Sequence, residues 1–401
     1  MKKILFVINT LGCGGAERAM LDLFAALEPE KYKISLFVLT NQGELSRELP
    51  EHVHLLNKNY NEVSVLTKEG RKILAKCVLR AGMGKGLFLR RAPYLVKNIR
   101  NMKKRGKILT DKLCWRILSD GAPVSKRKYD LAVAYLEGGA TYYVADHVKA
   151  KKKAAFVHID YGKAGYTREL DLNCYSKFDK IFTVSDEVKE HFLKVYPEYR
   201  RKVSVFHNMV NQERIRRRAD NGKGFGDDFQ GFRILTVGRL TGQKRYDIAI
   251  QAMTLLKEKS SLPVRWYVLG EGDLRESLEK QIKDAHLEKD FILLGVKSNP
   301  FPYYRECDLY VHATGFEGKS IAIQEAQTLG KPILATDCSG NREQILQDVD
   351  GRMCPLDPES ISTEILWMMA HPEKCRLYGE NAERKILHSR EGFEKFKALI
   401  Q

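Results

Sequence analysis

The sequence predicts an α/β protein with two domains, each built on a parallel sheet. The chain has 401 residues, of which 43% are hydrophobic, and this length is too great for one ordinary core. Short apolar runs rich in β-branched and aromatic residues alternate with stretches of helical character, which is typical of repeated strand-helix units. The alternation stops near residue 212 and starts again near residue 232. Two sheets are therefore expected.

The expected strands fall into two series. The first series comprises residues 3–8, 34–39, 130–135, 154–158 and 180–184. The second comprises residues 233–237, 265–269, 291–294, 309–313 and 332–336. Residues 213–231 between the series are dense in glycine and charge and are predicted to be a linker. The predicted domains are therefore 1–212 and 232–380, followed by a C-terminal helix at 381–401 that packs across both.

A basic segment, residues 68–128, interrupts the first series. Lys and Arg recur there between apolar residues, whereas Asp and Glu are scarce. Three interpretations stay open: a solvated helical insertion, a basic amphipathic surface for anionic lipid headgroups, or a nucleic-acid surface. The net charge of +17 attracts any of these anions. No zinc-finger, helix-turn-helix or aromatic nucleic-acid motif accompanies the charge, so nucleic acid ranks last and is not expected as a partner.

The apolar run at the start of the chain ends at Asn9 and Thr10, which makes it too short for an export signal. No other run approaches the roughly 20 apolar residues that span a bilayer. A cytoplasmic protein is expected, with peripheral attachment to the inner face of the cell membrane as the alternative.

The first glycine-rich turn is Leu11-Gly-Cys-Gly-Gly-Ala-Glu-Arg, between an expected strand and an expected helix. Exposed backbone N–H groups at such a helix N-terminus bind phosphate. Gly14 and Gly15 allow close approach of a ligand, although a tight turn alone explains them almost as well.

The second turn is Val237-Gly-Arg-Leu-Thr-Gly-Gln-Lys-Arg-Tyr-Asp. The strand ends at Gly238, and Arg239 and Lys244 follow in a short loop. These two cations can converge on one diphosphate, Arg through its planar fork and Lys as a point charge.

The third turn follows the strand that ends near residue 313, and it precedes a helix that starts near Ser320. Glu317 lies in the turn and Glu325 on the second helical turn, where each carboxylate can accept hydrogen bonds from sugar or ribose hydroxyls. Gly318 and Lys319 lie between the turn and the helix. Because a cation at a helix N-terminus opposes the macrodipole, Lys319 indicates an anionic ligand nearby.

The spacing of Glu317 and Glu325, with seven residues between them, and the preceding Gly-Arg-Leu-x-x-x-Lys resemble the donor site of glycosyltransferase family 4. The Gly-Gly-Ala-Glu-Arg and Phe206-His-Asn-Met-Val-Asn segments resemble that family too, so the similarity spans nearly the whole chain. The resemblance implies a GT-B fold, in which two Rossmann-like domains have parallel sheets that face a central cleft.

By that resemblance the protein is a retaining, metal-independent hexosyltransferase without a cofactor, and its donor substrate is a nucleotide-sugar. Arg239 and Lys244 neutralise the leaving diphosphate, Glu317 and the backbone after it hold the sugar, and Glu325 binds the ribose. The base packs near Val296. His158 matches the histidine that such enzymes place beside the donor sugar.

After Glu317 the chain has Gly-Lys-Ser-Ile where the commonest family pattern has Gly-Phe-Gly-Leu. This variant resembles enzymes of envelope or capsular polysaccharide biosynthesis, whose acceptors are saccharides or polyprenyl-linked saccharides. A UDP-sugar is favoured over a GDP-sugar as donor. Two other functions remain open: a sugar-nucleotide epimerase on the same scaffold, and a basic protein that binds nucleic acid or membrane through residues 68–128.

Overall fold

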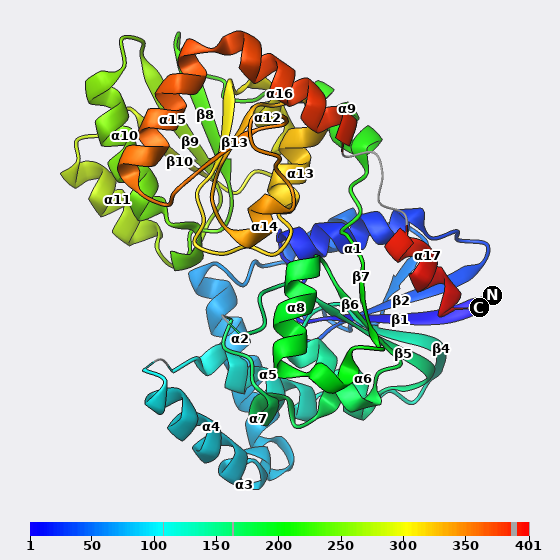
Figure 1. The fold of residues 1–401 in the computed structure, drawn as a ribbon. Helices are drawn as coiled ribbons and strands as arrows, with labels where there is room; N and C mark the ends of the chain where they lie inside the picture. The colour runs from blue at the N-terminus through cyan, green and yellow to red at the C-terminus, as the bar shows by residue number, and fades with distance from the viewer. Residues whose placement is uncertain (107, 163, 386–390, 401) are drawn as a thin grey trace. The chain divides into compact units, whose positions relative to one another are not determined.

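The computed structural model describes residues 1–106, 108–162, 164–385 and 391–400. The chain forms two compact units (Figure 1). Unit 1 comprises Met1–Met209 and Arg390–Gln401, and unit 2 comprises Val210–Ser389. Each unit is an α/β domain built on a parallel sheet. The predicted fold class, two α/β domains with parallel sheets, is confirmed.

Unit 1 contains a seven-stranded sheet in the order β3-β2-β1-β4-β5-β6-β7, in which every pairing is parallel. Its strands are β1 (Lys2–Ile8), β2 (Tyr32–Val38), β3 (Val53–Leu55), β4 (Lys128–Ala134), β5 (Lys149–Val157), β6 (Lys180–Thr183) and β7 (Val203–Val205). The five strands predicted from apolar runs are all present. The sequence analysis missed β3 and β7, the two edge strands, because three residues are too few to give a periodic pattern.

Alternate residues of β1 face opposite sides of this sheet, as the two-residue period of a strand requires. Ile4 and Phe6 belong to one buried cluster, and Leu5 and Val7 to the other. Helices α1 (Gly15–Ala26) and α17 (Glu391–Ala398) cover the first face, whereas α6 (Gly139–His147) and α8 (Asp186–Val195) cover the second (Figure 1). The remaining helical segments outside residues 68–128 are η1 (Glu44–Glu48), α7 (Arg168–Asp171), η3 (Cys174–Lys177) and η4 (Pro197–Tyr199).

The basic segment 68–128 is helical. Its helices are α2 (Lys68–Met83), η2 (Gly84–Gly86), α3 (Leu87–Arg90), α4 (Ala92–Lys104) and α5 (Thr110–Gly121). Leu118 of α5 lies in the core against the sheet, so this helix joins the segment to unit 1. Met102 of α4 packs with Leu113 and Leu170 in a small separate cluster. The segment is therefore a folded extension with its own small core.

Unit 2 contains a six-stranded parallel sheet in the order β10-β9-β8-β11-β12-β13. Its strands are β8 (Phe232–Val237), β9 (Val264–Leu269), β10 (Phe291–Gly295), β11 (Leu309–His312), β12 (Ile333–Thr336) and β13 (Arg352–Cys354). All five predicted strands are present, and the missed strand is again a three-residue edge strand, β13.

Helices cover both faces of this sheet (Figure 1). Helices α10 (Tyr246–Lys259), α11 (Arg275–Asp284) and α15 (Pro358–Ala370) pack on one face, and α9 (Gln212–Asp220), α12 (Phe301–Glu306) and α13 (Ile321–Thr328) pack on the other. The short segments η5 (Gly242–Lys244) and α14 (Ser339–Arg342) lie in loops, and α16 (Pro372–Lys385) contacts α13 and α15.

The segment predicted as a linker, 213–231, differs from that expectation. Residues 212–220 form α9, and its Ile215 and Ala219 are buried in the core of unit 2. Charge on the exposed face of this helix concealed its two core residues, which lie one turn apart. The change between units falls after Met209.

The expected C-terminal helix at 381–401 is also different. Its first residues continue α16 of unit 2, whereas α17 belongs to unit 1, and residues 386–390 lie outside the described part of the chain. Phe396 and Ile400 are buried in the core beneath the unit 1 sheet. The end of the chain therefore completes the core of the unit that the start of the chain forms.

A buried carboxylate stabilises the other side of unit 1. Asp171 is fully buried and accepts hydrogen bonds from the hydroxyls of Tyr142 (2.9 Å), Tyr161 (2.7 Å) and Tyr196 (2.5 Å). Burial raises the pKa of Asp171 to about 6, although the three hydroxyls and Arg116 oppose the rise. The folded protein therefore binds a proton here more tightly than the unfolded chain does.

This raised pKa has a measurable consequence. Stability from the protonated carboxyl is fully present below the ordinary pKa of 3.8 and is lost as the pH rises to about 6, because over this range the unfolded state has released its proton while the folded state still holds it. We expect Asp171→Asn, which resembles the protonated form, to become more stable relative to the wild type between pH 5 and pH 7.5, by about 1.4 kcal/mol. Thermal unfolding of both full-length proteins at the two pH values measures this, and parallel Tm shifts would contradict it.

Candidate functional site

In unit 2 the predicted site lies where the strand order reverses. Strands β9 and β10 follow β8 on one side, and β11, β12 and β13 continue on the other. Loops at the carboxyl ends of β8 and β11 therefore lead to helices on opposite faces of the sheet, and the carboxyl ends of such strands are the usual ligand position in an open parallel sheet. The loop with Arg239 and Lys244 follows β8, and the loop with Glu317 follows β11.

Hydrogen bonds join these two loops. The side chain of Gln243 donates to the carbonyl of Phe316 (2.8 Å), and the carbonyl of Gln243 accepts from the backbone of Gly315 (2.9 Å) and the hydroxyl of Thr314 (3.1 Å). Each of these groups is backbone or a short side chain. The neighbouring residues Lys244 and Glu317 are therefore held at fixed positions.

Lys244 and Glu317 form an ion pair in which both side chains are largely buried. His312, the last residue of β11, lies below them and is 1% exposed. Its Nε2 atom is 3.3 Å from Nζ of Lys244 and 3.3 Å from Oε2 of Glu317. The hydroxyl of Tyr310 lies 3.0 Å from the other ring nitrogen, Nδ1. The structure thus brings two predicted site residues together around a histidine.

The charges of this cluster follow from burial and from the partners. Burial alone would raise the pKa of Glu317, but Lys244 and His312 lower it well below its usual range. Burial and the nearby Lys244 lower the pKa of His312 to about 4. At neutral pH the cluster therefore contains a carboxylate, an ammonium and an uncharged imidazole.

Glu325 lies on α13, where the sequence predicted it, and is 5% exposed. Its Oε2 atom accepts a hydrogen bond from the hydroxyl of Tyr304 (3.0 Å), which also lies 3.2 Å from the carbonyl of Ala322. The rings of Tyr304 and Tyr310 lie 5.2 Å apart. Tyrosines from α12 and β11 therefore connect Glu325 to the cluster around His312.

The turn between Glu317 and α13 is held from below by Gln344. Its side chain accepts from the backbone N–H of Ser320 (2.6 Å) and donates to the carbonyl of Ser320 (2.8 Å). The hydroxyl of Ser320 caps α13 by accepting from the N–H of Ile323. Gly340 packs against this turn so closely that a Cβ atom there would clash with the carbonyls of Glu317 and Gly318. Backbone contacts thus define the shape of the turn.

The other predicted residues of unit 2 lie at the same sheet edge. Gly238 directly follows β8, and Arg239 is exposed, without a side-chain hydrogen bond or ion pair to any described residue. Val296 follows β10 and is 44% exposed. Gly318 is buried and Lys319 is half-buried in the turn before α13. All are positioned by the ends of parallel strands.

In unit 1 the predicted residues lie at the ends of β1 and β5. Gly14 is the N-cap of α1, and Gly15 is its first residue. His158 follows β5 and is 9% exposed, and its Nε2 atom has no hydrogen-bond partner among the described residues. Burial lowers the pKa of His158 to about 4, so the ring is neutral at pH 7. Its backbone N–H donates to the carboxylate of Glu137 (3.0 Å), which follows β4.

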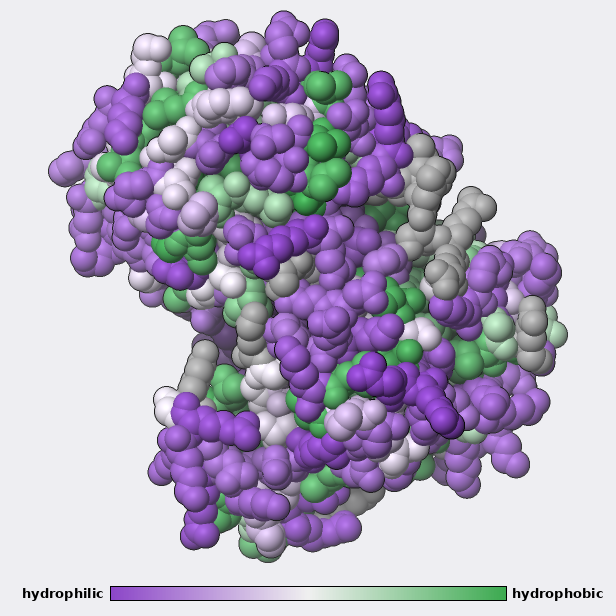
Figure 2. Space-filling model, in the orientation of Figure 1, coloured by the Kyte–Doolittle hydropathy of each residue, from purple (hydrophilic) through white to green (hydrophobic). Residues whose placement is uncertain are grey.

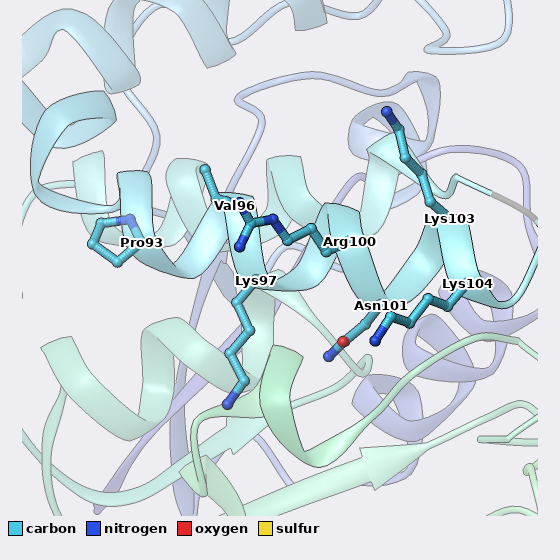
Figure 3. A pocket seen from close by; sticks show the side chains of 7 residues that line it. All are labelled: Pro93, Val96, Lys97, Arg100, Asn101, Lys103 and Lys104. Carbon is cyan, nitrogen blue, oxygen red and sulfur yellow. The ribbon is translucent and has the colours of Figure 1, made fainter.

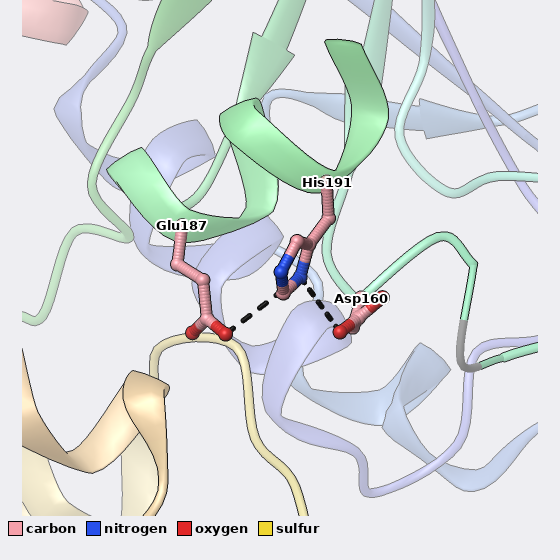
Figure 4. Close-up of side chains that lie close together, drawn as sticks. All are labelled: Asp160, Glu187 and His191. Carbon is pink, nitrogen blue, oxygen red and sulfur yellow. Dashed lines mark ion pairs between the residues drawn. The ribbon is translucent and has the colours of Figure 1, made fainter. Parts of the chain in front are cut away.

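A second polar cluster of unit 1 also lies after β5. His191 of α8 lies 2.7 Å from Oδ2 of Asp160 and 3.7 Å from Oε1 of Glu187, measured from its Nδ1 atom (Figure 4). The ligand atoms lie within 4.8 Å of one another, a spacing that could hold a metal ion. The contact between His191 and Asp160 is an ion pair when the ring is protonated.

The sequence analysis missed several residues that shape these sites. His312 and Tyr310 lie inside an expected strand, where an apolar pattern concealed them, although a histidine at the end of a strand that precedes a glycine-rich turn was a usable signal. Tyr304 and Gln344 are distant from the motifs in sequence, and only the fold brings them to the site. Glu137 likewise follows a strand end without a recognisable motif.

Part of the chain matches a known family, and its fold matches solved structures. Residues 225–385, most of unit 2, match the family described as glycosyl transferases group 1. The structure is similar to HepE from Anabaena in complex with UDP-glucose, with a TM-score of 0.69 and 16% identity over 100% of this chain and 98% of that one. It is also similar to TarM from S. aureus, with a TM-score of 0.67 and 13% identity over 100% and 99% of the two chains. The chain therefore has the two-domain fold of GT-B glycosyltransferases.

Curated relatives extend the similarity to both units. The chain is 26% identical over 405 residues to the N-acetylgalactosamine-N,N'-diacetylbacillosaminyl-diphospho-undecaprenol 4-alpha-N-acetylgalactosaminyltransferase of Campylobacter jejuni, covering 99% of this chain and 97% of that protein. It is 32% identical over 152 residues to the amylovoran biosynthesis glycosyltransferase AmsK of Erwinia amylovora, covering 36% and 37%. The resemblance to bacterial polysaccharide glycosyltransferases is confirmed, whereas family 4 and retention of configuration remain predictions.

The support given by Gln344 can be tested. We expect Gln344→Ala to lower the free energy of unfolding by about 2 kcal/mol, because the buried N–H of Ser320 loses its partner and the carbonyl of Ser320 keeps only the N–H of Gln324. Gln251→Ala, on the exposed surface of α10, is the matched control and should change it by about 0.5 kcal/mol or less. Chemical unfolding of the full chain measures both, and equal effects of the two variants would refute the role of Gln344.

Proposed function

We propose that this protein is a retaining glycosyltransferase that moves a sugar from a nucleotide-sugar to a saccharide or lipid-linked saccharide acceptor. The supporting observation is the cluster of Lys244, Glu317 and His312 at the strand-order reversal of unit 2. A cation and a carboxylate held side by side suit a donor that carries a diphosphate next to a polyhydroxyl ring. Neither charge is needed to hold the strands together, since the sheet core is apolar on both faces.

In this proposal Lys244 and the exposed Arg239 compensate the charge that develops on the leaving diphosphate. The backbone at the N-terminus of α13 adds the positive end of a helix dipole, so the charge is met without a metal ion. Glu317 and the backbone of Gly318, Lys319 and Ser320 hold the sugar. Glu325, fixed by Tyr304, accepts hydrogen bonds from the ribose.

Unit 1 contributes the acceptor side of the reaction and His158. The Nε2 atom of the neutral His158 ring can donate one hydrogen bond to a sugar hydroxyl or accept one from it. The N-cap Gly14 makes no side-chain cap hydrogen bond, and the carboxylate of Glu17 lies against it, so a ligand phosphate at Gly14 and Gly15 would have to displace that carboxylate. Retention follows in this proposal from attack of the acceptor hydroxyl on the same face as the leaving phosphate, whose oxygen accepts the proton.

The names of two similar proteins indicate which donor and acceptor substrates to propose. One relative transfers N-acetylgalactosamine to a diphospho-undecaprenol saccharide, and another is a UDP-Gal:alpha-D-GlcNAc-diphosphoundecaprenol alpha-1,3-galactosyltransferase of Escherichia coli, 25% identical over 52% of this chain. We therefore favour a UDP-sugar as donor and a polyprenyl-linked saccharide as acceptor, in envelope or capsular polysaccharide biosynthesis.

A lipid-linked acceptor requires access to a membrane surface. Every helix in the described part of the chain is too short or too polar to span a bilayer. The basic segment offers a peripheral alternative, since it contains exposed apolar side chains at Leu79, Met83, Phe88, Leu89 and Val96. In the view of Figure 2, hydrophobic patches are interleaved with hydrophilic residues over α3 and α4.

Cations gather around these apolar residues. A shallow hollow of about 530 Å³ on α4 is lined by Lys97, Arg100, Lys103 and Lys104, together with Pro93, Val96 and Asn101 (Figure 3). Figure 3 shows Lys97, Arg100 and Lys104 on successive turns of the helix. Apolar side chains that enter the headgroup region, flanked by cations that meet its phosphates, suit an anionic bilayer.

The donor site can be tested with a panel of UDP-sugars and GDP-sugars, with UDP-N-acetylgalactosamine, UDP-galactose and GDP-mannose as first members. We expect a Tm increase with UDP compounds, since a ligand at 100 times its Kd stabilises by about 2.7 kcal/mol. Glu325→Ala and Lys244→Ala should abolish transfer of the sugar and reduce the Tm increase. Thermal shift and product analysis measure these effects.

Glu279→Ala, on the exposed surface of α11, is the control and should retain full activity. Full activity in Glu325→Ala or Lys244→Ala would disprove the assignment of the site. Conversion of the UDP-sugar to an epimer without an acceptor would instead identify an epimerase.

Membrane association can be tested by sedimentation with vesicles that contain anionic phosphatidylglycerol. Replacing Lys97, Arg100, Lys103 and Lys104 by Ser should weaken binding at least tenfold, because each cation contributes about 1 kcal/mol near an anionic surface. The control replaces four exposed cations of unit 2 and removes the same charge: Lys223, Lys259, Lys283 and Lys289. Equal loss in both variants would show that only net charge matters, and would contradict a specific surface.

A further inference from the structure

His312 belongs to the cluster but to neither of the sequence motifs that contain Lys244 and Glu317. It is almost fully buried at the end of β11, beneath the ion pair of Lys244 and Glu317. Its Nε2 atom is 3.3 Å from both charged groups, and its Nδ1 atom is 3.0 Å from the hydroxyl of Tyr310. Both ring nitrogens therefore have polar neighbours.

The partners of an uncharged imidazole depend on its tautomer, since one nitrogen donates and the other accepts. Lys244 offers only donors, and the ionised Glu317 offers only acceptors. If Tyr310 donates to Nδ1, the proton lies on Nε2 and is donated to Glu317. If Nδ1 donates to Tyr310, Nε2 accepts from Lys244 instead.

The carboxylate of Glu317 has two hydrogen-bonding partners among the described residues, Lys244 and His312. In the proposed function Lys244 also contacts the diphosphate of the donor. The ammonium has three N–H donors, so it can contact the phosphate and Glu317 together, but its single charge is then shared between two anions. A largely buried carboxylate whose cation is shared is stabilised by a second donor within reach.

We propose that His312 is a positioning residue that holds Glu317 in place while Lys244 engages the diphosphate. In this arrangement the hydroxyl of Tyr310 donates to Nδ1, and Nε2–H donates to the carboxylate. The neutral ring supplies a donor without adding a charge that would compete for the diphosphate. The inference rests on the proposed function, because it assigns Lys244 to a nucleotide diphosphate.

The tautomer is directly observable. Nitrogen NMR of the full-length protein with ¹⁵N-labelled histidine, with His312 assigned from the spectrum of His312→Gln, distinguishes the two neutral forms and the charged form. With saturating UDP we expect a neutral ring with its proton on Nε2. A proton on Nδ1, or a charged ring, in the presence of bound UDP would overturn the inference and leave the proposed function standing. Absence of UDP binding by calorimetry would overturn both.

A double-mutant cycle separates positioning from packing. His312→Asn removes the donor at Nε2, so Lys244 stays paired with Glu317. We therefore expect UDP to bind about tenfold more weakly. This magnitude is typical of residues that orient a neighbouring site residue. His312→Gln keeps an amide donor near Nε2 and should stay within about threefold of the wild type. In the background of Glu317→Gln, where Lys244 has no carboxylate partner, His312→Asn should change UDP affinity less than about twofold.

The same loss of UDP affinity in both backgrounds would mean that His312 only fills space, and it would refute the inference. Tyr310→Phe provides a second route if His312→Asn does not fold. It removes the hydroxyl beside Nδ1 and leaves the ring of Tyr310 in the core. We expect a smaller loss of UDP affinity, about threefold, that again disappears in the Glu317→Gln background. An undiminished loss there would equally refute the inference.

Discussion

The ion pair between Lys244 and Glu317 is the interaction on which the site in unit 2 depends. Two opposite charges are held together at the top of an apolar sheet by loops that follow neighbouring parallel strands. Gln243 fixes one loop to the other, and His312 fills the space beneath. Removing either charge would leave the other largely buried without a partner, which is far more costly than losing a surface ion pair. The electrostatics of the site are therefore a property of the pair.

Two buried carboxylates of this protein show how partners decide charge. Asp171 is surrounded by tyrosine hydroxyls, and its pKa is raised to about 6 because hydroxyl donors do not fully replace water. Glu317 lies beside an ammonium and an imidazole. Burial raises the pKa of Glu317 as it raises that of Asp171, but these two neighbours lower it below the usual range. The first arrangement suits the core of a domain. The second keeps a permanent negative charge where a polar ligand can reach it.

The sequence predicted the elements that have a clear period or a clear motif. All ten expected strands are present, and Lys244 and Glu317 meet because their motifs follow strands that become neighbours. The three missed strands are edges of three residues each. His312 was hidden because a strand pattern records only which positions are buried, and a buried histidine looks like any core residue. Its importance depends on a loop 68 residues earlier, a contact that only the fold creates.

The end of the chain has a consequence for the order in which the protein can fold. Phe396 and Ile400 lie in the same core as Phe6 of β1, so unit 1 is assembled from segments that lie on either side of unit 2 in the sequence. During translation all of unit 2 emerges before that core can be completed. A ribosome-bound chain therefore exposes apolar residues of unit 1 that α17 later covers, and unit 2 is free to fold before that core is complete.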